Sequence, residues 1–339
     1  MIHMKAAGEM SYEAFTTENP ATDAAPAPKQ IRPAPDRRTK ETKIWAVGGG
    51  KGGIGKSFII SSVAQCLARR GHRIVLLDAD LGGANLHTFF GVDRPRTTLT
   101  EFFERQIPLS SLVCETGVPN LGLLIGALDT LAADHIRYTQ KMKLFRHIRT
   151  LPVDYVLIDI GAGTHFHTVD SFLLADTLIA AVVPELISVE NLYYFLKSVF
   201  YRKLLRAMSE NGWKTIIFET WKNRRTLGIR NVKELTDYLR TQSGEISDVI
   251  DETLSGFLFH IVVNKVRRRQ EIKVGLGVKS ICMKYFGLDA RYAGYIEHDE
   301  LVSRSINKRQ PYMQTHIGSR CSGQIEVVAE NLLQQKAFR

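Results

Sequence analysis

The chain has 339 residues, of which 44% are hydrophobic and 24% are charged, so it can bury the core of one large α/β domain. No apolar run approaches the roughly 18 residues that cross a bilayer, and no secretory signal opens the chain. These features argue against a membrane-spanning or exported protein. We therefore expect a cytoplasmic protein with a net charge of +10, and peripheral contact with the membrane or the nucleoid stays open.

The first 40 residues differ in composition from the rest of the chain. Residues 1–40 are rich in Ala, Pro, Thr and Glu and hold few large apolar side chains, which predicts a disordered N-terminal tail. A folded domain is then expected over residues 41–339. The four cysteines of the chain form no C-x-x-C spacing, so we interpret them as reduced thiols rather than metal ligands.

The first predicted strand, residues 44–47, leads into a glycine-rich loop. Residues 50–57 match G-x-x-x-x-G-K-[ST], in which glycines let backbone N–H groups close around phosphates. In this motif Lys56 reaches the β and γ oxygens and Ser57 binds Mg²⁺. A helix is expected to follow, because apolar residues recur at helical spacing at Ile59, Ile60, Val63, Ala64, Leu67 and Ala68. Strand, loop and helix in this order predict a nucleotide-binding site.

A second lysine, Lys51, stands at the start of the loop and has no role in the basic motif. Most of its neighbours are glycines, so a charged side chain at this position needs a use of its own. We interpret Lys51 as pointing away from its own nucleotide pocket, where it could reach a phosphate held by a second copy of the protein.

Beyond the loop, short apolar runs alternate with stretches that are long enough for crossover helices. The runs are rich in Val, Ile and Leu and mostly do not alternate with polar residues, as in strands covered on both faces. Right-handed crossovers then give an α/β fold with a doubly wound, mostly parallel sheet and helices on both faces, as in P-loop NTPases. The predicted strands are residues 74–77, 121–125, 155–158, 178–183 and 257–263.

Aspartates follow two of these predicted strands. Asp78 and Asp80 come at the end of the second apolar run, and Asp159 follows residues 155–158. Ligands of such sheets bind at the carboxyl ends of the strands, and carboxylates there suit a Mg²⁺ that is also held by water and phosphate. We interpret Asp159 as the Walker B acid. The alternative is that these aspartates only cap the following turns.

Three blocks of sequence resemble the deviant Walker A ATPases of the MinD/ParA group, over roughly residues 42 to 320. The blocks are Gly49–Ser57, Leu77–Leu86 and Asp154–Gly163, and they come in the order and at the spacing of that family. In detail they are similar to its MinD and FlhG (flagellar number regulator) branch.

The resemblance implies a Mg²⁺-dependent ATPase in which ATP is sandwiched within a homodimer. It assigns to Lys51 a contact with the partner's nucleotide and to Asp80 the positioning of the attacking water, beside the catalytic Lys56. It places Asp78 and Asp159 with Ser57 near Mg²⁺. The implied nucleotide-binding loop consists of Gly50, Lys51, Gly52, Gly53, Ile54, Gly55, Lys56 and Ser57.

Two residues further along the chain match nucleotide contacts of the same family. Asn264, which closes the predicted strand 257–263, matches an Asn that reads adenine, and its amide offers the donor and the acceptor that the adenine edge requires. The alternative is an ordinary turn Asn. Asp299, in Glu297-His298-Asp299, matches a late loop that contacts nucleotide.

The chain departs from the family between Pro184 and Asn264, which are further apart than in relatives. We expect a basic helical insertion at about residues 202–254, through which a protein activator could bind, although a solvated helical face is the alternative. A second basic run, residues 265–273, could contact nonspecific DNA or only balance the charge of the nucleotide. The first half of the insertion carries Arg202, Lys203, Arg206, Lys214, Lys222, Arg224, Arg225 and Arg230, with Trp213 and Trp221 among them.

Two classes of function therefore compete. The first is an ATP-dependent dimerising switch that positions or counts a cellular structure, such as a flagellum or a division site, with a DNA-partition ATPase of the ParA kind as a variant. The second is a biosynthetic, ATP-dependent ligase on the same fold. Lys51 favours the switch, because such a ligase usually lacks that residue.

Overall fold

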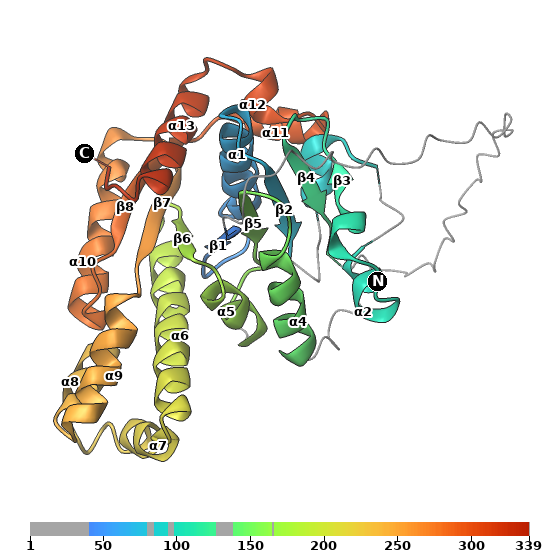
Figure 1. Cartoon of the computed structure of the whole chain (residues 1–339). Coiled ribbons are helices and arrows are strands. Elements are labelled where there is room, and N and C mark those ends of the chain that lie inside the picture. The colour runs from blue at the N-terminus through green and yellow to red at the C-terminus, as the bar shows by residue number, and fades with distance from the viewer. Residues whose placement is uncertain (1–40, 80–84, 94–97, 127–137, 165, 339) are drawn as a thin grey trace, which may run out of the picture.

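The computed structural model describes residues 41–79, 85–93, 98–126, 138–164 and 166–338. The predicted tail, residues 1–40, and the predicted catalytic Asp80 lie outside the described residues. The described chain forms one eight-stranded sheet with helices on both of its faces (Figure 1). Among the described residues, no helix is both long and apolar enough to cross a bilayer.

The sheet has the strand order β3-β4-β2-β5-β1-β6-β7-β8. All neighbouring strands are parallel except β3, which runs antiparallel to β4. The predicted doubly wound, mostly parallel α/β fold is therefore confirmed. The strands are β1 (Lys43–Gly48), β2 (Ile74–Asp78), β3 (Cys114–Glu115), β4 (Leu121–Leu124), β5 (Tyr155–Asp159), β6 (Thr177–Val182), β7 (Phe259–Val266) and β8 (Arg291–Glu297).

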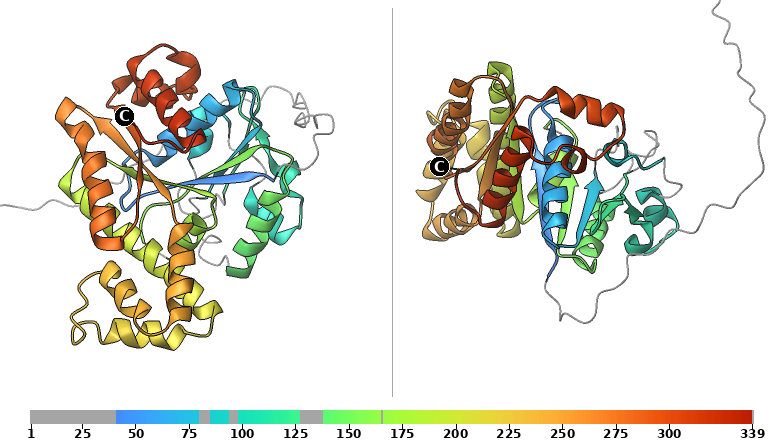
Figure 2. Two further views of the ribbon diagram at one scale, coloured as in Figure 1. Left: turned by 60° about the vertical axis from the view of Figure 1, so that its left-hand side comes forward. Right: turned by 90° about the horizontal axis from the view of Figure 1, so that it is seen from above.

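Two helical layers cover the sheet (Figure 2). Helices α1 and α13 pack together on one face, and α4, α5, α6 and α10 contribute to the core of the other face. The helices are α1 (Lys56–Arg69), α2 (Leu99–Glu104), α4 (Tyr138–Arg149), α5 (Phe166–Leu173), α6 (Leu186–Glu210), α7 (Lys214–Lys222), α8 (Val232–Arg240), α9 (Gly244–Ser255), α10 (Val274–Phe286), α11 (Glu300–Asn307), α12 (Tyr312–Thr315) and α13 (Arg320–Leu333), with short 3₁₀ turns at Leu86–Phe90, Leu109–Leu112 and Arg269–Lys273.

The central strands are apolar along their whole length because both of their faces are covered. Every residue of β2, β5 and β6 is buried, which explains why these runs do not alternate in the sequence. Helix α13 buries an apolar stripe that includes Ile325 and Val328, and ion pairs from Arg69 and Arg70 to Glu326 and Glu330 join it to α1. None of the four cysteines forms a disulfide.

The structure corrects the predicted strands in three places. Strand β3 has only two residues, which is too short to produce a recognisable pattern, and the edge strand β8 begins with Arg291 and ends with Glu297. Strand β7 continues to Val266, so Asn264 lies inside the strand rather than just after its end. The extra length places the Asn264 side chain at a fixed position on the sheet.

Between β6 and β7 the chain forms four helices. Helix α6 has 25 residues and is therefore about 37 Å long. Its first turns lie beside the glycine loop, because the backbone carbonyl of Asn191 adjoins Gly50. Helices α7, α8 and α9 gather around its other end, far from that loop (Figure 1). Residues 202–254 thus comprise the end of α6 and most of these three helices.

Candidate nucleotide-binding site

The glycine loop joins the carboxyl end of β1 to the start of α1. Gly55 occupies the N-cap position with φ of 90°, a left-handed conformation that favours glycine. The next residue, Lys56, is the first residue of α1 and is buried. The backbone N–H groups of the first helical turn point out of the helix end, where the helix dipole favours an anion. Loop and helix together can bind phosphate.

Close packing explains two of the glycines. A Cβ atom at Gly50 would overlap the backbone of Asn191 on α6, and one at Gly55 would overlap the side-chain amide of Asn264. At Gly53, by contrast, a Cβ atom would meet no atom within 4 Å. One side of the loop is therefore fixed against the protein, while its tip is open. This is the arrangement that a phosphate group needs in order to approach the backbone.

Strand β7 holds the loop through two neighbouring side chains. The Asn264 Nδ2 donates a hydrogen bond of 2.8 Å to the carbonyl oxygen of Ile54, and the Lys265 Nζ donates one of 2.7 Å to that of Gly53. Lys265 also has φ of 56°, which is uncommon for a residue other than glycine. The sequence analysis grouped Lys265 with the basic run and missed this contact. A lysine directly after the candidate adenine-reading Asn was the only available signal.

Two carboxylates lie side by side at the carboxyl edge of the sheet. Asp78 ends β2 and Asp159 ends β5, and the two residues are paired in the parallel register. They are only 1% and 4% exposed, and one oxygen of Asp78 accepts a hydrogen bond of 2.9 Å from the N–H of Leu86. Val47, at the end of β1, is also a register partner of Asp159, so the carboxylates adjoin the strand that leads into the loop.

The donor set fits a hydrated Mg²⁺. Charged groups are buried only where they are paired, hydrogen-bonded or bound to a metal, and Mg²⁺ prefers carboxylate, hydroxyl, water and phosphate oxygens. Buried Lys56, Asp78 and Asp159 gather around the loop, and Ser57 lies half-buried directly after Lys56. The structure thus brings the predicted phosphate and magnesium residues together at one edge of the sheet.

The two lysines of the loop lie in different environments. The side chain of Lys56 is buried at the start of α1, whereas Lys51, Gly52 and Gly53 are exposed at the open tip. An exposed lysine at this position can reach a group outside its own chain. A contact of Lys51 with a partner's nucleotide stays a prediction.

Asp299 lies near the site but has two contacts within the protein. One oxygen caps α11 by accepting a 2.8 Å hydrogen bond from the N–H of Leu301, and the other accepts one of 2.6 Å from the hydroxyl of Tyr312. Burial and the bond to Asp299 raise the pKa of Tyr312 far above its usual range. The Tyr312 ring packs edge-on against Phe58, which directly follows Ser57. Asp299 therefore supports the start of α1, and a nucleotide contact for it stays a prediction.

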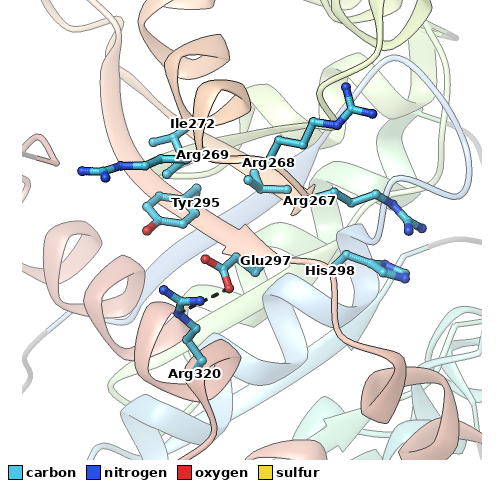
Figure 3. Close-up of a pocket in the computed structure, with 9 residues that line it drawn as sticks. Arg267, Arg268, Arg269, Ile272, Tyr295, Glu297, His298 and Arg320 are labelled. Carbon is cyan, nitrogen blue, oxygen red and sulfur yellow. Dashed lines mark ion pairs between the residues drawn. The ribbon is translucent and has the colours of Figure 1, made fainter.

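A pocket of about 630 Å³ opens next to this edge, between the segment that follows β7 and the end of β8 (Figure 3). Arg320, at the start of α13, pairs with Glu297 at 3.5 Å in the pocket. The side chains of Arg267, Arg268 and Arg269 line the pocket but extend away from one another, so their guanidinium groups do not converge on one point. This geometry does not suit a small anion.

Several basic side chains of the predicted insertion are paired with acids or stacked on an aromatic ring. Arg202 is bound to Asp170 of α5 through two hydrogen bonds of 2.7 and 2.9 Å. The aromatic residues Trp213 and Trp221 are half-buried, and Arg224 stacks over the Trp221 ring at 4.8 Å. Other basic residues in and beside the insertion are paired with nearby acids: Arg206 with Glu210, Arg230 with Glu234, Lys233 with Asp237, and Arg240 with Asp237 and Asp251.

The fold and the loop define a P-loop nucleotide-binding protein. Residues 45–312 match the family described as the CobQ/CobB/MinD/ParA nucleotide binding domain. Since the match covers most of the chain, the protein belongs to this family. The resemblance noted from the three sequence blocks is thereby confirmed.

Individual relatives agree with the MinD and FlhG side of the family. The chain is 28% identical over 158 residues to the flagellum site-determining protein YlxH of Helicobacter pylori, which covers 46% of this chain and 53% of that protein. It is 29% identical over 157 residues to the antiactivator FleN of Pseudomonas aeruginosa, which covers 46% and 55%. The chain thus spans about half the length of the curated relatives it matches.

Solved structures show the same fold. The septum site-determining protein MinD of Pyrococcus horikoshii, complexed with Mg-ADP, has a TM-score of 0.60 at 17% identity, covering 86% of this chain and 96% of that chain. A plasmid partition protein of Borrelia burgdorferi bound to AMPPNP has a TM-score of 0.57 at 16% identity, covering 87% and 99%. At these identities the likeness concerns the fold alone.

Proposed function

We propose that the protein is a Mg²⁺-dependent ATPase that works as an ATP-dependent dimerising switch. Its cellular task is the spatial positioning or number control of a structure such as the flagellum or the division site. The observation that carries this proposal is the separation of the two loop lysines, with Lys56 buried within the site and Lys51 exposed at its open tip.

Within one copy, the loop and the start of α1 bind the phosphates. Lys56 balances their charge from the buried side, and the open tip at Gly53 leaves room for the backbone N–H groups to approach them. The Asn264 Nδ2 is bound to Ile54, so we assign the amide oxygen to the exocyclic amine of adenine. Asn264 then fixes both the loop and the base.

Ser57, Asp78 and Asp159 are the residues that would hold Mg²⁺, either directly or through water. The ion neutralises charge on the β and γ phosphate oxygens when it is bound. Strands β2 and β5 hold these two carboxylates side by side in register at the edge of the sheet that carries the loop. Phosphoryl transfer needs little covalent chemistry from the protein, so these fixed groups and Lys56 supply most of what the reaction requires. Asp80 is proposed to position the attacking water.

A second copy would complete the site by delivering its own Lys51. The start of α6, which adjoins the loop at Asn191, exposes three large apolar side chains beside that lysine. Leu186 is 76% exposed, Ile187 is 60% exposed and Tyr194 is 57% exposed. An exposed apolar rim next to an exposed cation supports a surface that is buried by association. ATP would then favour the dimer, and hydrolysis would release it.

The names of the relatives support the cellular task. The matched proteins are called flagellum site-determining protein, septum site-determining protein and antiactivator, which favours a positioning or regulatory switch over a biosynthetic ligase. In this proposal a protein activator, bound through the helices at residues 202–254, controls the rate of hydrolysis. Measuring the ATPase rate with vesicles, with DNA and with neither tests whether a surface takes the place of such an activator.

The variant Lys51→Ala tests the central claim. It should bind a fluorescent ATP analogue about as tightly as the wild type but should form no dimer with non-hydrolysable ATP, as measured by light scattering after size exclusion. Lys56→Ala should lose nucleotide binding itself, and Lys43→Ala, which removes an exposed lysine outside the loop, should change neither property. Unchanged ATP-dependent dimers in Lys51→Ala would contradict the proposal.

A further inference from the structure

Helix α7 exposes an aromatic side chain between two lysines. Phe218 is 46% exposed, and the Lys214 Nζ lies 5.9 Å from the centre of its ring. Lys214 and Lys222 are exposed and stand four residues before and after Phe218, so both are its neighbours on the helix surface. The inner side of α7 is held by buried Ile217 and Thr220. The row of Lys214, Phe218 and Lys222 therefore has a fixed support.

A second ring extends this row toward α6. Trp221 follows Phe218 by three residues, which makes the two side chains neighbours on the helix. Lys197 of α6 and Arg224 lie over the Trp221 ring, at 5.4 and 4.8 Å from its centre. Tyr201 of α6 packs against the same ring, with 5.4 Å between the ring centres. These contacts place cations from both helices beside Phe218 on one continuous surface.

The cations of this surface have no acid to balance them. We call the surface formed by Lys197, Lys214, Phe218, Lys222 and Arg224 the α7 face. In the described part of the chain, no ion pair joins any of its four cations to a carboxylate. Over residues 211–232 a single acid accompanies five cations. A negatively charged partner would therefore be attracted to this face.

The N-terminal tail contains a segment of the opposite charge. Residues 9–23 hold four acids and no lysine or arginine. Among these acids stand Met10, Tyr12 and Phe15, which include the only tyrosine and the only phenylalanine of residues 1–40. This segment thus combines negative charge with large apolar side chains, as the α7 face combines positive charge with an exposed ring. Its acids are Glu9, Glu13, Glu18 and Asp23.

We propose that residues 9–23 dock on the α7 face of their own chain. The carboxylates of the segment would pair with the four cations, and Tyr12 or Phe15 would pack on the exposed part of Phe218. The connection is long enough for this contact. Residues 24–40 can extend to about 56 Å, which exceeds the length of about 37 Å of α6, the helix whose far end carries α7.

Nucleic acid fits the α7 face less well than an acidic peptide. Single-stranded nucleic acid binds such surfaces by stacking its bases on free aromatic rings. Here Lys214 lies over the Phe218 ring, and Lys197 and Arg224 lie over the Trp221 ring. These cations compete with a base for the rings, whereas a carboxylate can pair with the same cations where they stand.

The inference concerns a contact within one chain and does not rest on the proposed switch. It has a consequence for that switch, because the α7 face lies largely within the helices to which we assign a protein activator. An activator that binds there would have to displace the tail. The test uses the protein without nucleotide and without any other protein, so its failure is distinct from a failure of ATP binding or of dimerisation.

The experiment is hydrogen–deuterium exchange of the full chain, read by mass spectrometry. At low salt, the amides of residues 9–23 should exchange about fivefold or more slowly in the wild type than in Lys214→Gln/Lys222→Gln. Phe218→Gln should also speed their exchange, because it removes the apolar contact. High salt should weaken the protection in the wild type. In the reverse direction, Glu9→Gln/Glu13→Gln/Glu18→Gln should speed the exchange of α7.

Matched controls separate the α7 face from general effects of charge and apolar surface. Lys308→Gln/Lys336→Gln removes two other exposed lysines, and Ile317→Gln removes another apolar side chain, which is 68% exposed. Both variants should protect residues 9–23 like the wild type. The thermal midpoint of every variant is measured in parallel, to show that the fold is kept.

Two results would overturn the proposal. The first is equal exchange of residues 9–23 in the wild type and in Lys214→Gln/Lys222→Gln, which would leave the α7 face to a separate acidic partner. The second is protection that disappears when the protein is diluted about tenfold, because a contact within one chain does not depend on concentration. That result would assign the docked segment to another copy of the protein.

Discussion

The nucleotide edge of the sheet and the helices at residues 202–254 differ in how their charged side chains are buried and paired. At the nucleotide edge, Lys56, Asp78 and Asp159 are buried on rigid strands and on the first turn of a helix. In the helices at residues 202–254, Arg206, Arg230 and Lys233 are instead paired with acids one helical turn away, and their side chains are between 44% and 85% exposed. Buried charge is costly unless a partner or a ligand is fixed in place, whereas exposed pairs contribute little. The number of charges is thus a poor guide to function, and their burial is a better one.

The largest expected effect is a loss of nucleotide affinity when a single methyl group is added to the loop at Gly55. In Gly55→Ala the new Cβ would overlap the amide of Asn264, and the position has φ of 90°. We expect nucleotide affinity to fall by about 100-fold or more, since both the loop and Asn264 must move. Titration with a fluorescent ATP analogue measures this change.

Gly71→Ala is the matched control for Gly55→Ala. Gly71 has a similar φ of 87°, but its Cβ would meet no atom within 4 Å. It should cost about 1–2 kcal/mol of stability from backbone strain and should leave nucleotide binding unchanged. Equal loss of binding in the two variants would show that strain, rather than the contact with Asn264, is responsible.

The stability of the protein should depend on pH through His260, which lies on β7 in the sheet. Burial, assisted by nearby Arg291, lowers the pKa of His260 on β7 from 6.5 to about 4. Between these values the unfolded chain binds a proton that the folded chain does not bind, so stability is full above pH 6.5 and falls as the pH drops. The loss should approach about 3 kcal/mol near pH 4.

Urea unfolding between pH 7 and pH 4 measures this loss. His260→Gln should flatten the pH profile, whatever its effect on stability at pH 7, because Gln does not titrate. His147→Gln, which replaces an exposed histidine on α4, should leave the profile as it is. A profile that His260→Gln leaves equally steep would assign the pH dependence to other groups.

The ion pair between Arg202 on α6 and Asp170 on α5 should contribute measurably to stability. Arg202 is about a third exposed, and its partner Asp170 is only 14% exposed. Arg202→Gln should therefore lower the free energy of unfolding by about 1 kcal/mol, which is less than a fully buried pair would cost, because solvent screens part of the interaction. A double-mutant cycle with Asp170→Asn isolates the pair, and a coupling energy near zero would contradict this estimate.

The smallest effect on stability is expected on α8. Lys233 and Asp237 form a pair of 2.6 Å in which both side chains are more than 40% exposed. Lys233→Gln should change the free energy of unfolding by less than about 0.5 kcal/mol, and high salt should remove even this difference. A larger loss would show that the helices at residues 202–254 depend on their exposed ion pairs for stability.

Much of the nucleotide site could be predicted because its signals are local. The loop and the aspartates at the ends of β2 and β5 each occupy a few consecutive residues. Parallel strands bring their carboxyl ends to one edge, so these separate segments had to meet there. The edge strand β8 and the two-residue β3 gave no such pattern, and neither was predicted. The hydrogen bond from Lys265 to the carbonyl oxygen of Gly53 could not be predicted. It depends on β7 continuing beyond Asn264 and on the positive φ of Lys265.

The sequence by itself determined the fold class, the family and the residue types of the candidate phosphate and magnesium site, because short motifs and buried apolar runs have few physical solutions. Only the tertiary structure decided which charged side chains are buried, exposed or paired. It buried Lys56 and exposed Lys51, it engaged Asp299 with Tyr312, and it paired several cations of residues 202–254, such as Arg206 and Arg230, with acids. It also left Phe218 exposed beside Lys214 on α7. Burial and pairing depend on which distant segments come together, and no local pattern contains that information.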